Sequence, residues 1–188
     1  MILALLLLLQ LLGPNPVLGA QVASIHDIAL INTEHGLLLF FELRNIFTPE
    51  LEAGVMNGIP ASFIFTARLG PADPKRAEEV IRSKTFEHTI TYDTLKDEYR
   101  VRCTEKGEEV MVVKDFGTAK QLASEVNGAL LVDLATLVKG NDYLVRVKAS
   151  LTRNTLPLNV HNLIPFWKPW DVETDWHATS FRFAAPSP

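Results

Sequence analysis

The strict alternation of apolar and polar residues over residues 86–92 limits the choice of fold more than any other feature of this chain. Four large side chains take every second place, with polar residues between them: Phe86, His88, Ile90 and Tyr92. Successive side chains of a strand point to opposite faces of its sheet, so this period of two predicts a strand with one buried face. Turn residues follow at 94–97 and 105–108. The simplest prediction is three consecutive antiparallel strands over 86–92, 99–104 and 110–114.

Further strands are predicted on both sides of this group. Residues 22–30 and 37–44 flank a turn and indicate a hairpin, while residues 61–69 indicate a strand buried on both sides. A strand with one wet face is expected over 142–151, then a long loop over 152–175 and a last strand over 176–183. Because no strand–helix–strand repeat occurs, we expect a mainly β protein. Its fold would be an antiparallel β-sandwich, immunoglobulin-like or C2-like, of about eight strands with two or three short helices.

Two short helices are predicted from their terminal signals. Thr48 precedes Pro49 and acidic residues occupy the first turn, so a helix is expected over residues 49–57. Thr118 and Gln121 form a capping-box pair, which predicts a second helix that closes at residues 127–128. The charged stretch 73–83 is expected to be a third short helix or a solvated loop, and 129–138 stays open between strand and helix.

The first twenty residues have the pattern of a secretory signal peptide. Residues 2–12 form an uncharged apolar run, which Gly13 and two prolines end. A run of this length fits the roughly 7 to 15 residues of a secretory core and is shorter than the roughly twenty needed to span a bilayer. We expect cleavage after Ala20, a single domain over residues 21–183 and a disordered tail over 184–188. An uncleaved segment that tethers the chain to a membrane is the alternative.

The net charge, the cysteine content and the spacing of the histidines restrict the classes of function that this chain can have. The net charge of −4 disfavours nucleic acid as a partner. The one cysteine, Cys103, excludes an internal disulfide, and its alternation with Tyr99 and Val101 predicts a buried thiol. The five histidines lack the spacing of zinc sites, and His88 is expected to be a hydrogen-bonded core residue. Because no catalytic or phosphate-binding motif occurs, we expect no cofactor and no enzyme activity.

One acidic series has the alternate spacing with which carboxylates can meet a hard cation: Asp171, Glu173 and Asp175. A calcium loop also needs a glycine at its sixth position and a glutamate at its twelfth, where this chain has Trp176 and Arg182. A solvated loop face is therefore the favoured interpretation of the three acids, and a metal site is the weaker one.

Aromatic residues are concentrated in the predicted loop and at the start of the last strand. Tryptophan is a favoured binding anchor because it buries a large area at a small entropy cost, and Pro165 and Pro169 restrict the loop. The candidate binding residues are these aromatics and two polar neighbours: Asn159, His161, Phe166, Trp167, Trp170 and Trp176. The alternative is that the rings cover one open end of the sandwich.

Four local patterns carry a resemblance to a known family: Gly58-Ile59-Pro60, residues 92–101, residues 156–160, and Asp175-Trp176. The chain resembles a bacterial family of small exported proteins, the domain of unknown function numbered four-three-nine-zero. The resemblance extends along the whole mature chain and supplies no catalytic mechanism. Members of this family are frequently encoded beside a membrane sensor kinase of the nitrogen-regulation type and a ribosomal RNA methyltransferase, so the resemblance implies export and at most an association with such neighbours. We expect the exported chain to lie in the periplasm. The charged segment 70–84 departs from the family pattern, which has aromatic residues there.

These observations favour an exported, non-enzymatic binding or accessory module of the bacterial cell envelope, with an envelope or membrane protein as its partner and no membrane span in the mature chain. Residues 156–176 would form the contact surface. An envelope hydrolase built around His161 and Asp171 is one alternative. The other is an envelope assembly factor that pairs an edge strand with a partner chain, through the strand at Ser24 or the strand at Trp176.

Overall fold

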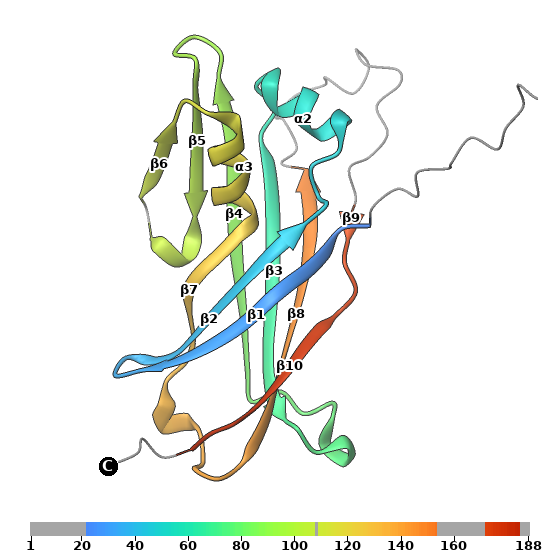
Figure 1. Cartoon of the computed structure of the whole chain (residues 1–188), viewed down its shortest axis with the longest axis vertical. Helices are drawn as coiled ribbons and strands as arrows, with labels where there is room; N and C mark the ends of the chain where they lie inside the picture. The colour runs from blue at the N-terminus through green and yellow to red at the C-terminus, as the bar shows by residue number, and fades with distance from the viewer. Residues whose placement is uncertain (1–21, 108, 154–171, 185–188) are drawn as a thin grey trace, which may run out of the picture.

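The computed structural model describes residues 22–107, 109–153 and 172–184, which form two stacked antiparallel sheets (Figure 1). The smaller sheet has the order β1 (Ser24–Thr33), β2 (Gly36–Arg44), β7 (Glu125–Val132). The larger sheet has the order β10-β8-β3-β4-β5-β6, and the short strand β9 pairs with β8. Its bounds are β3 Ala61–Pro71, β4 Arg82–Asp93, β5 Glu98–Cys103, β6 Val110–Val113, β8 Asp142–Arg153, β9 Val172–Glu173 and β10 His177–Arg182. The predicted antiparallel β-sandwich is confirmed.

The core lies between the two sheets and is filled by every second residue of each strand. On β3 the inward residues Phe63, Phe65 and Leu69 are completely buried, and Leu39 on β2 is buried opposite them. The rings of Phe41 and Phe65 meet edge to face with their centroids 5.3 Å apart. Each such side chain contributes about 1.5–3 kcal/mol by leaving water, so this layer supplies the main stabilisation of the fold.

The outer face of the larger sheet is only partly covered along β3, which corrects one prediction. Residues 61–69 were expected to be buried on both sides, but Ile64 and Thr66 are only partly buried and Arg68 is exposed. Helices α2 and α3 lie on the side of the smaller sheet (Figure 1), so neither helix covers the outer face of β3. On that face Ser62 is buried and Trp176 lies against Arg68.

The first predicted helix is confirmed and the second has different ends. Helix α2 spans Pro49–Met56, and the Thr48 hydroxyl accepts a hydrogen bond from the Leu51 amide at 3.3 Å. Helix α3 spans Phe116–Ser124, with Asp115 as its N-cap. The predicted capping box at Thr118 is therefore wrong. The Asp115 carboxylate already accepts the Thr118 amide at 2.6 Å, and residues 127–128 belong to β7 because they pair with β2.

Shorter segments connect the strands. The charged stretch 73–83 contains a 3₁₀ turn at Pro74–Arg76, and another turn, Leu134–Thr136, follows β7. The last strand is confirmed as β10, and β9 replaces part of the predicted long loop. The rest of that loop, at 154–171, and residues 185–188 of the predicted tail lie outside the described residues. Among the described residues, no helix is both long enough and apolar enough to cross a bilayer.

Candidate functional site

Trp176 is the candidate binding residue that the structure describes. The other five candidates, Asn159, His161, Phe166, Trp167 and Trp170, lie outside the described residues. Trp176 comes directly before β10, which pairs with β8 at one edge of the larger sheet. Its side chain is 38% exposed, so it is a surface residue rather than part of the core.

The indole of Trp176 lies beside two cations from neighbouring strands. The guanidinium carbon of Arg68 is 4.8 Å from the ring centroid, and the ammonium of Lys148 is 5.8 Å from it. Both cations are on the outer face of the sheet, where β3 and β8 run side by side. Each contact of this kind contributes about 0.5–1 kcal/mol at an exposed site. The tryptophan is therefore held in place while it remains accessible.

The predicted acidic series lies next to this tryptophan. Glu173 forms an ion pair with Lys148, and the backbone carbonyl of Asp175 accepts hydrogen bonds from the Thr174 hydroxyl and from His177 Nδ1. Asp171 lies outside the described residues, so the convergence of the three carboxylates stays a prediction. The pairing of Glu173 with Lys148 agrees with the interpretation of a solvated, charged surface.

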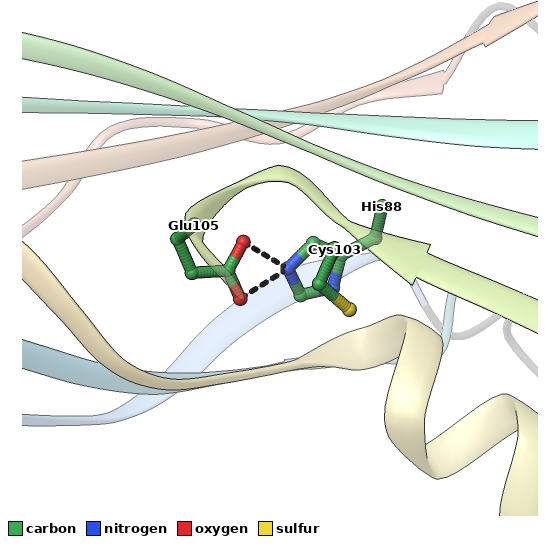
Figure 2. A group of neighbouring side chains, drawn as sticks. All are labelled: His88, Cys103 and Glu105. Carbon is green, nitrogen blue, oxygen red and sulfur yellow. Dashed lines mark hydrogen bonds and ion pairs between the residues drawn. The ribbon is translucent and has the colours of Figure 1, made fainter. Parts of the chain in front are cut away.

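His88 and Glu105 form a buried hydrogen-bonded pair inside the sandwich (Figure 2). The His88 side chain is completely buried and the Glu105 side chain is 4% exposed. His88 Nε2 lies 3.0 and 3.1 Å from the two carboxylate oxygens of Glu105, and Nδ1 lies 3.1 Å from the carbonyl oxygen of Ala123. The prediction that His88 is a hydrogen-bonded core residue is confirmed.

The partners of His88 define how its protons are arranged. A carbonyl oxygen only accepts hydrogen bonds, so Nδ1 carries a proton and donates it to Ala123. Nε2 and the Glu105 carboxylate share one further proton. The pair has no net charge whether that proton is on the nitrogen or on the oxygen. Both ring nitrogens are occupied and shielded from water, so this arrangement anchors β4 to the turn after β5 rather than presenting a base to a substrate.

Cys103 lies against the same pair and is also buried, as predicted. Its sulfur donates to the Leu122 carbonyl at 3.8 Å. Burial, and to a lesser extent the nearby Glu105 charge, raise the pKa of the Cys103 thiol to about 12, so it is protonated at neutral pH. Ligand atoms of His88, Cys103 and Glu105 lie within 4.8 Å of one another. The Glu105 carboxylate contacts the His88 ring directly (Figure 2), so these two ligand groups are engaged with each other.

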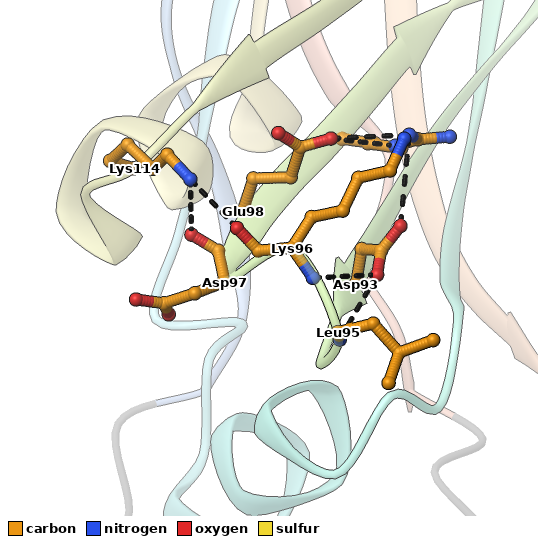
Figure 3. Close-up of polar contacts among 7 residues, drawn as sticks. Asp93, Leu95, Lys96, Asp97, Glu98 and Lys114 are labelled. Carbon is orange, nitrogen blue, oxygen red and sulfur yellow. Dashed lines mark hydrogen bonds and ion pairs between the residues drawn. The ribbon is translucent and has the colours of Figure 1, made fainter.

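The hairpin between β4 and β5 forms a tightly bonded tip (Figure 3). The Asp93 carboxylate accepts hydrogen bonds from the backbone amides of Leu95 and Lys96, each at 3.1 Å. The Lys114 ammonium donates to the carbonyls of Lys96 and Asp97 at 2.8 and 2.9 Å. Asp97 has a positive φ of 53° and needs this support, because non-glycine residues rarely adopt that conformation.

This tip displays one apolar side chain to solvent. Leu95 is 95% exposed, the largest exposed fraction among the large apolar residues that the structure describes. The Tyr92 hydroxyl donates to Asp97 at 2.6 Å, which raises the pKa of Tyr92 and fixes the base of the tip. Gly58, with a φ of +80°, lies beside Tyr92 and Thr94. Two of the family-like patterns, residues 58–60 and 92–101, therefore meet at this end of the sandwich.

A wide groove of about 860 Å³ lies at the other end of the larger sheet. Part of its wall is the segment 70–84, which departs from the family pattern, and Tyr143 and Phe181 form a stacked pair beside it with centroids 5.6 Å apart. Its charges are paired, because Arg76 binds Glu79 at 2.7 Å and Arg182 lies 3.9 Å from Asp142. This groove was not predicted from the sequence, because its residues come from three separate segments.

Comparison with protein families gives a match over most of the chain. The model of the family described as Domain of unknown function (DUF4390) matches residues 20–180. The chain belongs to this family. The resemblance drawn from the four local patterns is thereby confirmed, and the match to DUF4390 includes every described strand except the end of β10. No curated protein and no solved structure matches the chain.

Glu105, like Arg68 and Lys148, is a residue of the DUF4390 chain that was not predicted from the sequence. It was assigned to a turn, but it is two residues beyond Cys103 and continues the inward-facing alternation of Tyr99, Val101 and Cys103. An acidic residue at an inward position indicates a buried partner, because a lone buried carboxylate is too costly. This signal indicates that Glu105 needs a buried partner, but the contact with His88 depends on the fold of the 3₁₀ turn after β5.

Proposed function

We propose that this DUF4390 protein is an exported, non-enzymatic binding module of the bacterial cell envelope that serves a membrane protein, such as a membrane sensor kinase, as an accessory. The observation that carries the proposal is the position of Trp176, which is exposed and lies against Arg68 and Lys148 on the outer face of the larger sheet. Tryptophan and arginine are the residues most enriched in binding hot spots. A tryptophan that is already ordered loses little entropy when a partner covers it.

The hairpin tip gives further support. A leucine that is 95% exposed gains free energy when a partner buries it, and the backbone around it is already fixed by Asp93 and Lys114. The buried His88–Glu105 pair supports a binding role as well, because its titratable groups are occupied by structural contacts. The signal-like residues 1–20 motivate the placement of this module outside the cytoplasm.

Affinity capture from cross-linked envelopes tests this function. The tagged chain from Gln21 onward is used as bait, and the recovered proteins are identified by mass spectrometry. We expect the wild-type bait to recover a specific membrane protein. Trp176→Ala should reduce the recovered amount of that protein by about tenfold, equivalent to about 1.4 kcal/mol of binding free energy. Trp167→Ala and Trp170→Ala extend the same test to the candidates outside the described residues.

Val138→Ala is the matched control for that experiment. Val138 is 61% exposed and lies among the residues of the wide groove, so it tests whether any loss of exposed apolar surface weakens capture. Recovery of the same partner by wild type, Trp176→Ala and Val138→Ala in equal amounts would refute the role of Trp176. Recovery of no specific partner by the wild type would refute the binding module itself.

A second candidate function is supported by the sheet edges. The strands at Ser24 and Trp176, β1 and β10, are both edge strands in the described sheets, as an assembly factor that pairs with a partner strand requires. β1 has a bulge between His26 and Ala29, which disfavours continuous pairing there. Slower hydrogen exchange of the β10 amides in the captured complex than in the free protein would favour this alternative. The hydrolase alternative depends on His161 and Asp171, which lie outside the described residues.

A further inference from the structure

Strand β2 is apolar on both of its faces along its first half. Leu37, Leu39 and Phe41 point into the core and are buried. Leu38 and Phe40 point the other way, to the outside of the smaller sheet, where a solvated strand would carry polar residues. The sequence of β2 therefore resembles that of a strand covered on both faces, although the described residues cover only one.

The outward residues of all three strands join into one surface. The strand register places Ile31 of β1 opposite Leu38 of β2, and Leu38 opposite Leu130 of β7. Ile31 is 49% exposed and Leu130 is 44% exposed. Ala29 lies opposite Phe40 in the same way. We call this surface the outer apolar patch, and it consists of Ala29, Ile31, Leu38, Phe40 and Leu130.

Gly128 shapes the patch beside Phe40. A Cβ atom at Gly128 would lie 3.7 Å from the tip of the Phe40 ring, so the tip of that ring lies beside the backbone of Gly128. In Figure 1 no described element crosses the front of β1, β2 and β7. The patch is thus contiguous, and no described element lies over it, which are properties of an interaction surface rather than of scattered exposed side chains.

The residues next to the patch are mainly acidic. Glu42 follows Phe40 on the same face of β2, and the register places it opposite Glu125 of β7. The exposed Asp27 forms an ion pair with Arg44, which also binds Glu42 at 2.7 Å. The nearby Lys120 is paired with Glu52 at 2.7 Å. Asp27 and Glu42 thus share one guanidinium, while Glu125 accepts a hydrogen bond from the neutral Gln121 amide at 2.9 Å, so the local charge at this end of the patch is negative.

From these observations we propose that the outer apolar patch docks a partner's amphipathic helix whose flanking residues are basic. Three strands are about 10 Å across, which matches the diameter of a helix of about 10–12 Å. A helix packs its apolar stripe against a sheet face, and its basic flanks would meet Glu42 and Glu125. A second copy of this chain or an anionic lipid surface would bring like charges together there, so both are disfavoured.

A labelled peptide tests the proposal in solution. The probe is a helical peptide of about 18 residues with leucines on one side and lysines on the other, and its anisotropy is titrated with the chain from Gln21 onward, which keeps every described strand. We expect saturable binding that the double variant Ile31→Ser/Leu130→Ser weakens by about tenfold or more. Glu42→Gln/Glu125→Gln should weaken binding several-fold and flatten its salt dependence.

The matched control is Val110→Ser/Val112→Ser on β6. These two valines are 46% and 52% exposed, close to the values for Ile31 and Leu130, but they lie in the other sheet. Binding by this variant should stay within about twofold of wild type, and thermal unfolding checks that each variant folds. A leucine–glutamate peptide of the same pattern should bind about tenfold more weakly than the leucine–lysine probe.

Three results would overturn the proposal. The first is no binding by the wild type, or an equal loss in the Ile31→Ser/Leu130→Ser and Val110→Ser/Val112→Ser variants. The second is a dimer in sedimentation experiments that Ile31→Ser/Leu130→Ser dissociates, since the occupant would then be a second copy. The third is wild-type binding to phosphatidylglycerol vesicles that the same variant abolishes. None of these depends on Trp176, which lies on the other sheet, so the two proposals fail independently.

Discussion

Individual residues of this chain show how one buried polar contact depends on another. His88 uses both ring nitrogens, and each partner comes from a different element: the turn after β5 supplies Glu105, and helix α3 supplies the carbonyl of Ala123. Burial of an ionisable group without such partners would cost the folded protein several kcal/mol of stability. The pair therefore fixes the relative position of β4, β5 and α3 at the centre of the core.

Removal of the Glu105 carboxylate should destabilise the fold strongly. Glu105→Ala leaves His88 Nε2 buried without a partner, and we expect the free energy of unfolding to fall by about 3 kcal/mol. Glu105→Gln supplies an amide N–H that donates to Nε2 of the neutral ring, while Nδ1–H keeps its bond to Ala123, and it should cost only about 1 kcal/mol. Urea unfolding at pH 7 measures both, with the exposed Glu34→Ala as control. Equal losses for Glu105→Ala and Glu34→Ala would show that the pair contributes nothing.

The Cys103 thiol should make stability fall at alkaline pH. Its pKa is raised from 9.0 to about 12 in the folded protein, so the unfolded chain loses this proton first as pH rises. The contribution of Cys103 is complete below about pH 9 and is lost progressively between about pH 9 and 12, at up to about 1.4 kcal/mol per pH unit. Urea unfolding between pH 8 and about pH 11 should show a shallower decline for Cys103→Ala than for wild type. If the free energy of unfolding falls with pH equally in wild type and Cys103→Ala, the Cys103 thiol is not the cause of the alkaline loss of stability.

Side-chain burial within the strands could be predicted, because it follows directly from the period of two. His88 and Cys103 occupy inward positions in the sequence pattern and are buried in the structure. The partner of His88 was not predicted, since contact between residues 88 and 105 depends on how the turn after β5 folds back. Trp176 was predicted as a candidate, but its neighbours Arg68 and Lys148 were not, because they are brought together by the pairing of β3 with β8.

At the scale of elements, the ends of helices and turns are fixed by single polar side chains. Thr48 caps α2 as the sequence indicates, whereas α3 begins earlier than predicted because Asp115 is the better-placed acceptor. The Asp115 carboxylate accepts hydrogen bonds from the Thr118 amide and hydroxyl, and these bonds lower the pKa of Asp115. The capping carboxylate is therefore charged at neutral pH. Residues 125–132 form a strand rather than the end of a helix because the pairing of β7 with β2 outweighs the local turn signal of Asn127-Gly128.

The hairpin tip between β4 and β5 depends on Lys114 as a clamp. Lys114→Met removes the hydrogen bonds to the carbonyls of Lys96 and Asp97 but keeps the length of the side chain. We expect the amides of residues 94–98 to exchange about tenfold faster, with little change in β3. Hydrogen-exchange mass spectrometry measures this, with the exposed Lys139→Met as control. Unchanged exchange at the tip would mean that Asp93 and Tyr92 hold it without Lys114.

At the scale of the whole molecule, the predicted sandwich is correct, but the order of its strands was not available from the sequence. The hairpins β1–β2, β3–β4, β4–β5 and β5–β6 join neighbours in the chain, and local turn signals predict such pairs. The pairings of β3 with β8 and of β2 with β7 join distant segments, and no local signal specifies them. These two distant pairings position the outward faces that carry Trp176 and the outer apolar patch, so neither surface could be assembled from sequence alone.

The boundary between the signal-like segment and the folded core gives a final prediction. Val22 is 77% exposed, whereas Ala23 and Ile25 are buried at 6% and 3%, so the core begins directly after the expected cleavage point. A chain that starts at Gln21 should therefore unfold cooperatively with the full set of β1–β2 contacts. A chain that starts at Asp27 loses three paired residues of β1, including the buried Ile25, and it should be less stable by roughly 3 kcal/mol. Urea unfolding compares the two chains, and the intact mass of the protein recovered from the envelope locates the natural start. A mature start beyond Ile25, or equal stability of the two chains, would contradict this boundary.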